Sequence, residues 1–202
     1  MPMLDRDGRP RGWFTDRDAE LYVAAARQLP LNGVLVEVGT YLGRSTSYVA
    51  EIVHQQGARL VCIDHWRGSS NDCTASMQTN GPEMLAAFHD NMRHLGLSKF
   101  MEVRVLDSLS AAAEFKDESI DVVFLDADHS YGQVRQDIRI WWPKLKTDGL
   151  LLGHDYYRFY SGNHTDGVKM AVEETFGLPD AVSGSVWQVR KSAVRHVRIS
   201  SR

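Results

Sequence analysis

The sequence predicts one α/β domain in which a mostly parallel sheet carries helices on both faces. Short apolar segments rich in β-branched residues alternate with segments of helical apolar spacing along most of the chain. That order requires parallel strands joined by crossover helices. The chain has 202 residues, 43% of them hydrophobic, which suffices for a single domain, residues 1–202, around one sizeable core.

The first half of the chain supplies three strands and three helices. Thr15 caps the first helix, which carries acidic residues in its first turn and stops at Pro30. Gly57 and Gly96 end the next two helices. The helices are predicted over residues 15–29, 45–56 and 83–95, and the strands over residues 34–38, 59–64 and 101–106. The polar stretch 67–82 has little periodicity, which is typical of a loop that is functional or disordered.

The second half continues the same alternation and then changes it. Helices are predicted over residues 110–115, 131–142 and 167–176, and the middle one stops at Pro143. Strands are predicted over residues 120–125, 149–153, 181–182 and 186–190. The last two strands are separated only by the turn at residues 183–185, so they are expected to pair as an antiparallel hairpin.

The strand at residues 34–38 runs directly into a glycine turn and a helix, as in nucleotide-like cofactor sites. A dinucleotide fingerprint needs glycines at the first, third and sixth positions of this turn, and only the first, Gly39, is present. Tyr41 and Arg44 occupy the other two positions, and no Gly-Lys-Ser/Thr of a Walker loop follows. What remains is Glu37-x-Gly39-x-x-x-Gly43, whose carboxylate suits a ligand with cationic groups.

The segment Val36-Glu-Val-Gly-Thr-Tyr-Leu-Gly-Arg-Ser45 resembles the class I S-adenosylmethionine (SAM)-dependent methyltransferases, in the form found in small-molecule O-methyltransferases. The resemblance implies a Rossmann-like fold with a seven-stranded sheet. It also implies cofactor contacts from residues of the turn, namely Glu37, Gly39, Thr40, Tyr41, Gly43 and Ser45. The alternative for this motif alone is an ordinary strand-turn-helix of an α/β protein.

Further cofactor residues are expected at the carboxyl ends of the next strands, where open α/β sheets bind ligands. Asp64 stands where the family's acidic residue accepts hydrogen bonds from the ribose hydroxyls, with a plain turn aspartate as the alternative. His65 and Trp66 flank that position, and Trp66 is interpreted either as a stacking partner of the cofactor or as core. Asp107 and Ser108 either contact the adenine edge or cap the following helix.

A second group of polar residues follows the strands at 120–125 and 149–153. Asp126 and Asp155 end strands that are neighbours in the family's sheet order, close enough to share Mg²⁺ or another divalent cation. This resembles the metal-dependent, catechol-type O-methyltransferases, although Tyr156 replaces the asparagine that follows the second aspartate in those enzymes. His154, with Asp128 and His129, can supply the missing ligand. The alternative is a metal-free group of polar residues that face the substrate.

His129 is the residue predicted to act as general base, with Asp126 as its catalytic partner. Imidazole titrates near neutral pH, and the Asp-x-x-His spacing is similar to that of macrocin-type sugar O-methyltransferases, in which the resemblance implies deprotonation of the acceptor hydroxyl. The alternative is that His129 caps the helix that begins near Tyr131.

Composition limits the range of partners. A balance of 26 acidic against 23 basic residues argues against nucleic acid, and no window approaches about 18 consecutive apolar residues. A cytoplasmic protein with a small-molecule acceptor, a sugar or a phenol, is expected, and the exposed aromatics and first helix are consistent with a homodimer. Residues 67–82 and the aromatic residues at 156–160 are the expected pocket walls. Two other hypotheses remain open, a non-catalytic SAM-binding protein and an NAD-binding oxidoreductase.

Overall fold

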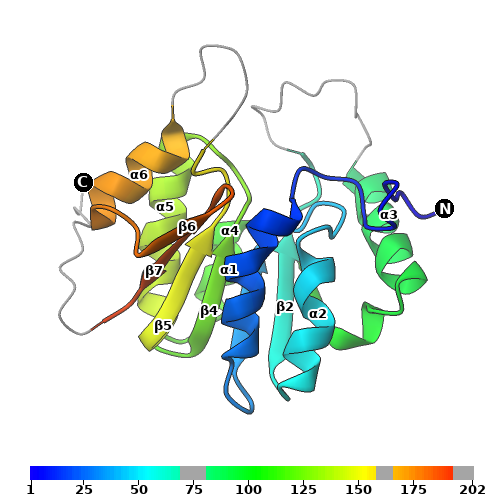
Figure 1. Ribbon diagram of the computed structural model, residues 1–202, viewed down its shortest axis with the longest axis horizontal. Coiled ribbons are helices and arrows are strands. Elements are labelled where there is room, and N and C mark those ends of the chain that lie inside the picture. The colour runs from blue at the N-terminus through cyan, green and yellow to red at the C-terminus, as the bar shows by residue number, and fades with distance from the viewer. Residues whose placement is uncertain (69–80, 158–165, 193–202) are drawn as a thin grey trace.

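The computed structural model describes residues 1–68, 81–157 and 166–192. Its strands are β1 (Val34–Val38), β2 (Arg59–Asp64), β3 (Glu102–Val105), β4 (Ile120–Leu125), β5 (Leu145–Gly153), β6 (Ala181–Ser183) and β7 (Val186–Arg190) (Figure 1). Its α-helices are α1 (Asp16–Arg27), α2 (Thr46–Gln55), α3 (Gly81–His94), α4 (Ser108–Ala113), α5 (Tyr131–Trp141) and α6 (Gly167–Phe176). Short 3-10 helices span Ser98–Phe100 and Trp142–Lys144.

The strands form one seven-stranded sheet in the order β3-β2-β1-β4-β5-β7-β6. β1 pairs in parallel with β2 and β4, and the pairs β2–β3 and β4–β5 are parallel as well. β7 is antiparallel to both β5 and β6. This topology confirms the predicted mostly parallel sheet with a C-terminal antiparallel hairpin, and it places the carboxyl ends of β1, β2, β4 and β5 along one edge.

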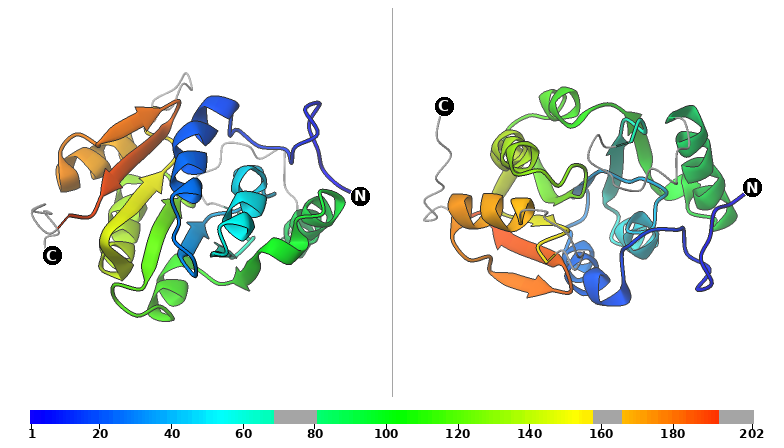
Figure 2. Two further views of the ribbon diagram at one scale, coloured as in Figure 1. Left: turned by 60° about the horizontal axis from the view of Figure 1, so that its bottom comes forward. Right: turned by 90° about the horizontal axis from the view of Figure 1, so that it is seen from above.

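Helices cover both faces of the sheet because alternate strand residues point to opposite sides. Leu35 of β1 belongs to a core packed under α1, α2 and α3, whereas Val36 and Val38 belong to a second core under α4, α5 and α6. Viewed from above, α1 and α2 lie on one side of the sheet and α4 and α5 on the other (Figure 2). Within the described residues, no helix has the length and apolar character needed to cross a membrane.

Two element boundaries differ from the prediction for local reasons. α4 begins at Ser108 instead of residue 110, because Asp107 accepts the Ser110 N–H and acts as the N-cap. β5 begins at Leu145 instead of residue 149, and the register shift between Ile120 and Val122 accommodates its polar first half. Of the predicted loop at 67–82, residues 69–80 lie outside the described part of the chain, and Gly81 already belongs to α3.

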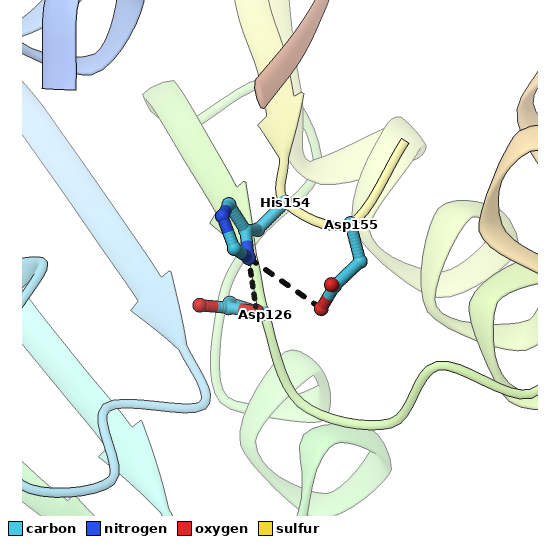
Figure 3. A group of neighbouring side chains, drawn as sticks. All are labelled: Asp126, His154 and Asp155. Carbon is cyan, nitrogen blue, oxygen red and sulfur yellow. Dashed lines mark ion pairs between the residues drawn. The ribbon is translucent and has the colours of Figure 1, made fainter. Parts of the chain in front are cut away.

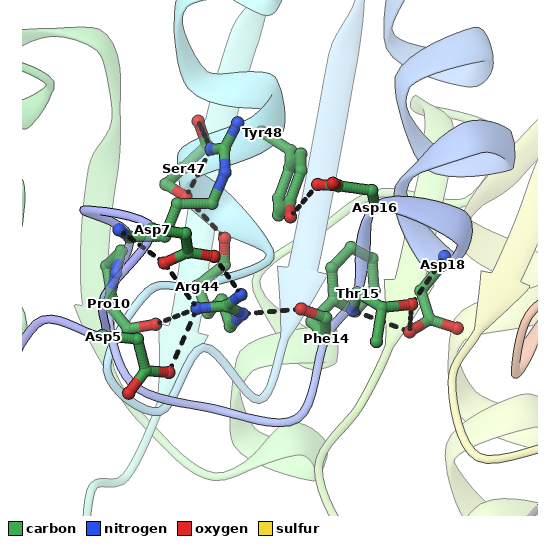
Figure 4. A network of polar contacts seen from close by, with 11 residues as sticks. Asp5, Asp7, Pro10, Phe14, Thr15, Asp16, Asp18, Arg44, Ser47 and Tyr48 are labelled. Atoms are coloured by element: carbon green, nitrogen blue, oxygen red, sulfur yellow. Dashed lines mark hydrogen bonds and ion pairs between the residues drawn. The ribbon is translucent and has the colours of Figure 1, made fainter.

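The first fourteen residues lie against α3, where Met1 and Met3 bond to Asp90 and Asn91, and against the start of α2, where one arginine makes most of the contacts. The Arg44 guanidinium donates hydrogen bonds to the carbonyl oxygens of Phe14 (2.6 Å) and Pro10 (2.9 Å), and it pairs with Asp5 and Asp7 (Figure 4). Arg44 is the residue that excludes a dinucleotide fingerprint in the sequence, and in the structure it anchors this N-terminal segment across the glycine turn.

Candidate functional site

The glycine turn after β1 is built around close backbone approaches. Gly39 has a φ of +89°, and a Cβ atom placed on it would lie 2.2 Å from the carbonyl oxygen of Asp126. Gly43 has a φ of +86°, and its Cβ would lie 2.5 Å from the Met92 Cε atom of α3. Both positions therefore require glycine, and the turn touches the end of β4 directly.

Glu37 does not face the ligand side of this turn, which corrects the expectation for its carboxylate. Its side chain is completely buried and accepts hydrogen bonds from the hydroxyl groups of Tyr22 (3.1 Å), Ser45 (2.5 Å) and Thr46 (3.0 Å). The Ser45 hydroxyl donates to Glu37, so this bond gives no support to its predicted contact with the cofactor, which stays a prediction. These residues join α1 to the start of α2 behind the turn.

Thr40 and Tyr41 follow Gly39 in the turn, with Thr40 buried and Tyr41 partly exposed. The buried Thr40 hydroxyl has no hydrogen-bond partner among the described residues, which leaves it available to a ligand. Tyr41 has a φ of +48°, and its N–H donates to the Asp64 carboxylate at 2.9 Å. Its ring stacks on Trp13, with centroids 6.1 Å apart, and Trp13 is half exposed. Trp13 was not predicted as a site residue, because it precedes the first predicted helix.

Asp64 links the ends of β1 and β2. Its second oxygen accepts the Trp66 N–H at 2.6 Å, and its side chain retains 15% exposure, as a ribose ligand needs. His65 lies beside it and is 38% exposed. Trp66 is only 1% exposed, donates its indole N–H to the Tyr41 carbonyl and packs on Phe88. This burial supports the core alternative for Trp66, and its stacking on a cofactor stays a prediction.

Asp107 and Ser108 follow β3 and bond to helices. Both Asp107 oxygens accept from Ser110, which confirms the capping alternative and lowers the pKa of this carboxyl group. The Ser108 hydroxyl donates to Asp137 at 2.5 Å and accepts from the indole of Trp141 at 2.9 Å. Their predicted contact with the adenine edge gains no support from these bonds.

The carboxyl ends of β4 and β5 bring Asp126, His154 and Asp155 together, as predicted (Figure 3). One ligand atom from each of the three lies within 4.8 Å of the others. The His154 Nδ1 atom is 3.6 Å from an Asp126 oxygen and 3.4 Å from an Asp155 oxygen. Two carboxylates and one imidazole at this spacing form a donor set for a divalent cation.

His129 completes this cluster from the loop that follows β4. Its Nε2 atom is 2.8 Å from an Asp155 oxygen and 3.6 Å from an Asp126 oxygen. The N-cap of α5 is Ser130, whose N–H donates to Asp128, so the capping alternative for His129 is not what the structure shows. Asp128 serves that turn and is not among the three residues grouped as cation ligands.

A family model described as "Methyltransferase domain" matches residues 36–156, which is more than half of the chain. The chain belongs to this family. The match makes the segment a SAM-dependent methyltransferase domain that contains both the glycine turn and the cluster at the ends of β4 and β5. It favours methyl transfer over the oxidoreductase hypothesis.

Other comparisons add the fold and one distant relative. The uncharacterized protein y4gI of Sinorhizobium fredii is 25% identical over 124 residues, which cover 60% of the methyltransferase chain but only 13% of that relative. A SAM-dependent O-methyltransferase of Thermotoga maritima has a TM-score of 0.61 at 14% identity, covering 92% of this chain and 69% of its own. A methyltransferase of Geobacter sulfurreducens has a TM-score of 0.59 at 20% identity, covering 96% and 82%. At these identities the structures show a shared fold.

Charges around the cluster of the methyltransferase are strongly coupled. Burial lowers the pKa of His129, but the interactions with Asp126 and Asp155 outweigh it and raise the pKa to about 10. Burial also lowers the pKa of His154, but the nearby carboxylates outweigh it and raise this pKa well above its usual value. Burial raises the pKa of Asp155, but the imidazoles of His129 and His154 outweigh it and hold this pKa well below its usual range. The two carboxylates therefore favour the protonated form of the His129 imidazole, and its role as general base stays a prediction.

Tyr156 takes no part in this cluster of the methyltransferase. It is 3% exposed, and its hydroxyl donates to Glu173 of α6 at 2.7 Å, so it is neither a ligand nor a pocket wall. Tyr157 is 45% exposed, as a wall residue needs, whereas residues 158–160 lie outside the described part of the chain. Asp18 of α1 was not predicted to lie near this cluster. An acidic residue in the first turn of a helix is common, so its position in the sequence did not indicate a contact with His154.

Proposed function

We propose that this methyltransferase moves the SAM methyl group to a hydroxyl oxygen of a small molecule, a sugar or a phenol. The observation that carries the proposal is the contact between the two halves of the site. The Asp126 backbone lies directly against Gly39, while the Asp126 side chain belongs to the cluster with His154 and Asp155. A cofactor bound at the turn and an acceptor bound at the cluster would therefore be neighbours.

On the cofactor side, the backbone of residues 39–43, the Thr40 hydroxyl and the Asp64 carboxylate offer the groups that a nucleoside requires. Asp64 already accepts two backbone N–H groups, and each of its oxygens has a further lone pair for the ribose hydroxyls. Glu37 contributes from behind the turn by holding Ser45 and Thr46 at the start of α2.

On the acceptor side, the donor set of Asp126, Asp155 and His154 fits a divalent cation such as Mg²⁺. Such a cation supplies charge that lowers the pKa of an acceptor hydroxyl and offsets the two carboxylates. A bound cation would weaken the carboxylate interactions that raise the pKa of His129, and a neutral His129 could then accept the acceptor proton at Nε2. The acceptor oxygen then attacks the methyl carbon in line, the carbon–sulfur bond breaks, and S-adenosylhomocysteine leaves.

The test is a comparison of His129→Ala with His54→Ala, whose imidazole stacks on Phe100 at the far end of α2. His129→Ala is expected to lower turnover by about 10² to 10⁴, because proton transfer is lost, while the affinity for S-adenosylhomocysteine stays unchanged. Labelled SAM with a panel of sugars and phenols measures turnover, and calorimetry measures affinity. Full activity of His129→Ala would reject the base.

Two further outcomes separate the alternatives. EDTA is expected to lower the rate and Mg²⁺ or Mn²⁺ to restore it, whereas an enzyme indifferent to the chelator would keep the base and reject the cation. SAM binding without methylation of any acceptor would favour the non-catalytic SAM-binding protein. A homodimer stays a prediction, and sedimentation measures it.

A further inference from the structure

Asp18 lies in the first turn of α1. Its side chain contacts His154 and Ser185, which are more than 100 residues away in the sequence. One of its oxygens accepts the Ser185 N–H at 2.7 Å, and the other accepts from the Thr15 N–H at 2.7 Å and the Thr15 hydroxyl at 2.6 Å. The second oxygen also lies 3.6 Å from the Nε2 atom of His154. Both side chains are at least nine-tenths buried.

The two nitrogens of the His154 ring face different groups. Nδ1 faces the carboxylates of Asp126 and Asp155, whereas Nε2 is buried without a hydrogen-bond partner among the described residues. The Phe14 ring covers the imidazole, with centroids 5.3 Å apart. Among the described residues, the acid that pairs with Nε2 is Asp18, at 3.6 Å.

The chemistry of these groups decides which nitrogen carries hydrogen. An ionised carboxylate only accepts, so Asp126 and Asp155 favour hydrogen on Nδ1 and Asp18 favours hydrogen on Nε2. With a cation bound by Asp126 and Asp155, the demand for hydrogen on Nδ1 would be removed, and Asp18 would leave the lone pair of a neutral imidazole on Nδ1. That lone pair lies between the carboxylates of Asp126 and Asp155. A carboxylate behind a ligating histidine fixes the tautomer and the ring orientation and makes the imidazole a stronger ligand.

We propose that Asp18 is a positioning residue that holds His154 with Nδ1 toward the cation, and that the site consequently prefers a transition metal over Mg²⁺. The inference rests on the proposed function, because it requires a cation bound by Asp126, Asp155 and His154. Imidazole nitrogen is a good ligand for Ni²⁺ and Zn²⁺, whereas Mg²⁺ prefers oxygen, so the contribution of His154 determines the ratio of the affinities.

The proposal predicts a change of selectivity that a merely structural role of Asp18 would not cause. We expect Asp18→Ala to lower Ni²⁺ affinity about 10- to 100-fold and Mg²⁺ affinity less than about threefold, as calorimetry on protein without a histidine tag measures. Thr15→Ala is the matched control, since it removes the hydroxyl bond to Asp18 and leaves the contact between Asp18 and His154 in place. It should keep both affinities, and His154→Ala should lose the preference for Ni²⁺.

The outcomes distinguish this inference from the proposed function. Equal losses for both metals in Asp18→Ala, or unchanged affinities, would overturn the inference and leave the cation site standing. Wild-type protein that binds neither metal would reject the cation of the proposed function and this inference with it. If Asp18→Ala does not fold, ¹⁵N-histidine NMR of the Zn²⁺-loaded wild type decides: hydrogen on Nε2 of His154 is expected, and hydrogen on Nδ1 would overturn the inference.

Discussion

The buried Glu37 carboxylate is surrounded by hydroxyl groups, and no basic side chain of the described residues forms an ion pair with it. Three hydroxyls donate to its carboxylate, from Tyr22, Ser45 and Thr46. Burial disfavours the charge more than these bonds favour it, and the pKa of Glu37 rises to about 7. The side chain is therefore a pH-dependent part of the fold behind the cofactor turn.

A stability difference between wild type and Glu37→Gln follows from this shift. The pKa of the folded state lies above the ordinary value of 4.5, so the protonated carboxyl group favours folding. This contribution is fully present below pH 4.5 and is lost as the pH rises through 7. At about 1.4 kcal/mol per pKa unit it is on the order of 3 kcal/mol. Urea unfolding of both proteins at pH 5 and pH 8 measures it, and an equal pH dependence in the two would contradict the shift.

Asp64 gives the matching prediction for the cofactor. Asp64→Asn is expected to weaken binding of S-adenosylhomocysteine by about 1.5 to 3 kcal/mol, because a charge-assisted hydrogen bond to the ribose is lost. Asp121→Asn is the control, since Asp121 also accepts a backbone N–H, from Val34, but at the opposite edge of the sheet. Calorimetry on both variants checks the assignment, which an unchanged affinity of Asp64→Asn would remove.

At the scale of elements, the decisive contact is the one between the turn after β1 and the end of β4. The Gly39 backbone packs so closely on the Asp126 carbonyl that a Cβ atom at residue 39 would lie 2.2 Å from its oxygen. The cofactor turn and the cation cluster therefore share a backbone contact, while their side chains come from different strands.

Replacing each glycine of the turn by alanine should distinguish the cost of a clash with backbone atoms from the cost of a clash with a side chain. Gly39→Ala is expected to cost roughly 3 kcal/mol of stability, because the new Cβ meets backbone atoms that cannot give way. Gly43→Ala should cost roughly 1 to 2 kcal/mol, because its Cβ meets the flexible end of Met92. Thermal unfolding measures both, and a larger loss at Gly43 would contradict the role of the backbone contact.

For the whole molecule, strand-helix alternation was enough to predict the sheet, because parallel crossovers leave few topologies. The sheet order implied by the resemblance predicted that Asp126 and Asp155 meet, with His154 as a candidate third ligand, and β4 and β5 are indeed neighbours. The sequence motif did not show on which face Glu37 lies, although its alternation with Val36 and Val38 carried that information. The contacts of Asp18 and Trp13 could not be predicted from the sequence, because they depend on how α1 and the N-terminal segment pack against distant parts of the chain.

The helix α1 is expected to be essential to the fold, whatever the oligomeric state. Its Tyr22 is completely buried and stacks on Phe124 of β4, with centroids 4.2 Å apart, and its Ala25 and Ala26 are at most 1% exposed. The apolar face of α1 is thus used within the chain, which removes one reason to expect a homodimer.

Deletion of residues 1–28 would uncover the core that α1 shares with α2, so the truncated chain should lose its cooperative unfolding transition. Arg27→Ala, on the exposed side of α1, is the control and should change stability by less than about 0.5 kcal/mol. Urea titration followed by circular dichroism measures both. If the truncated chain unfolds cooperatively and still binds S-adenosylhomocysteine, α1 is not essential to the fold. The contact between Asp18 and His154 would then not be needed for folding either.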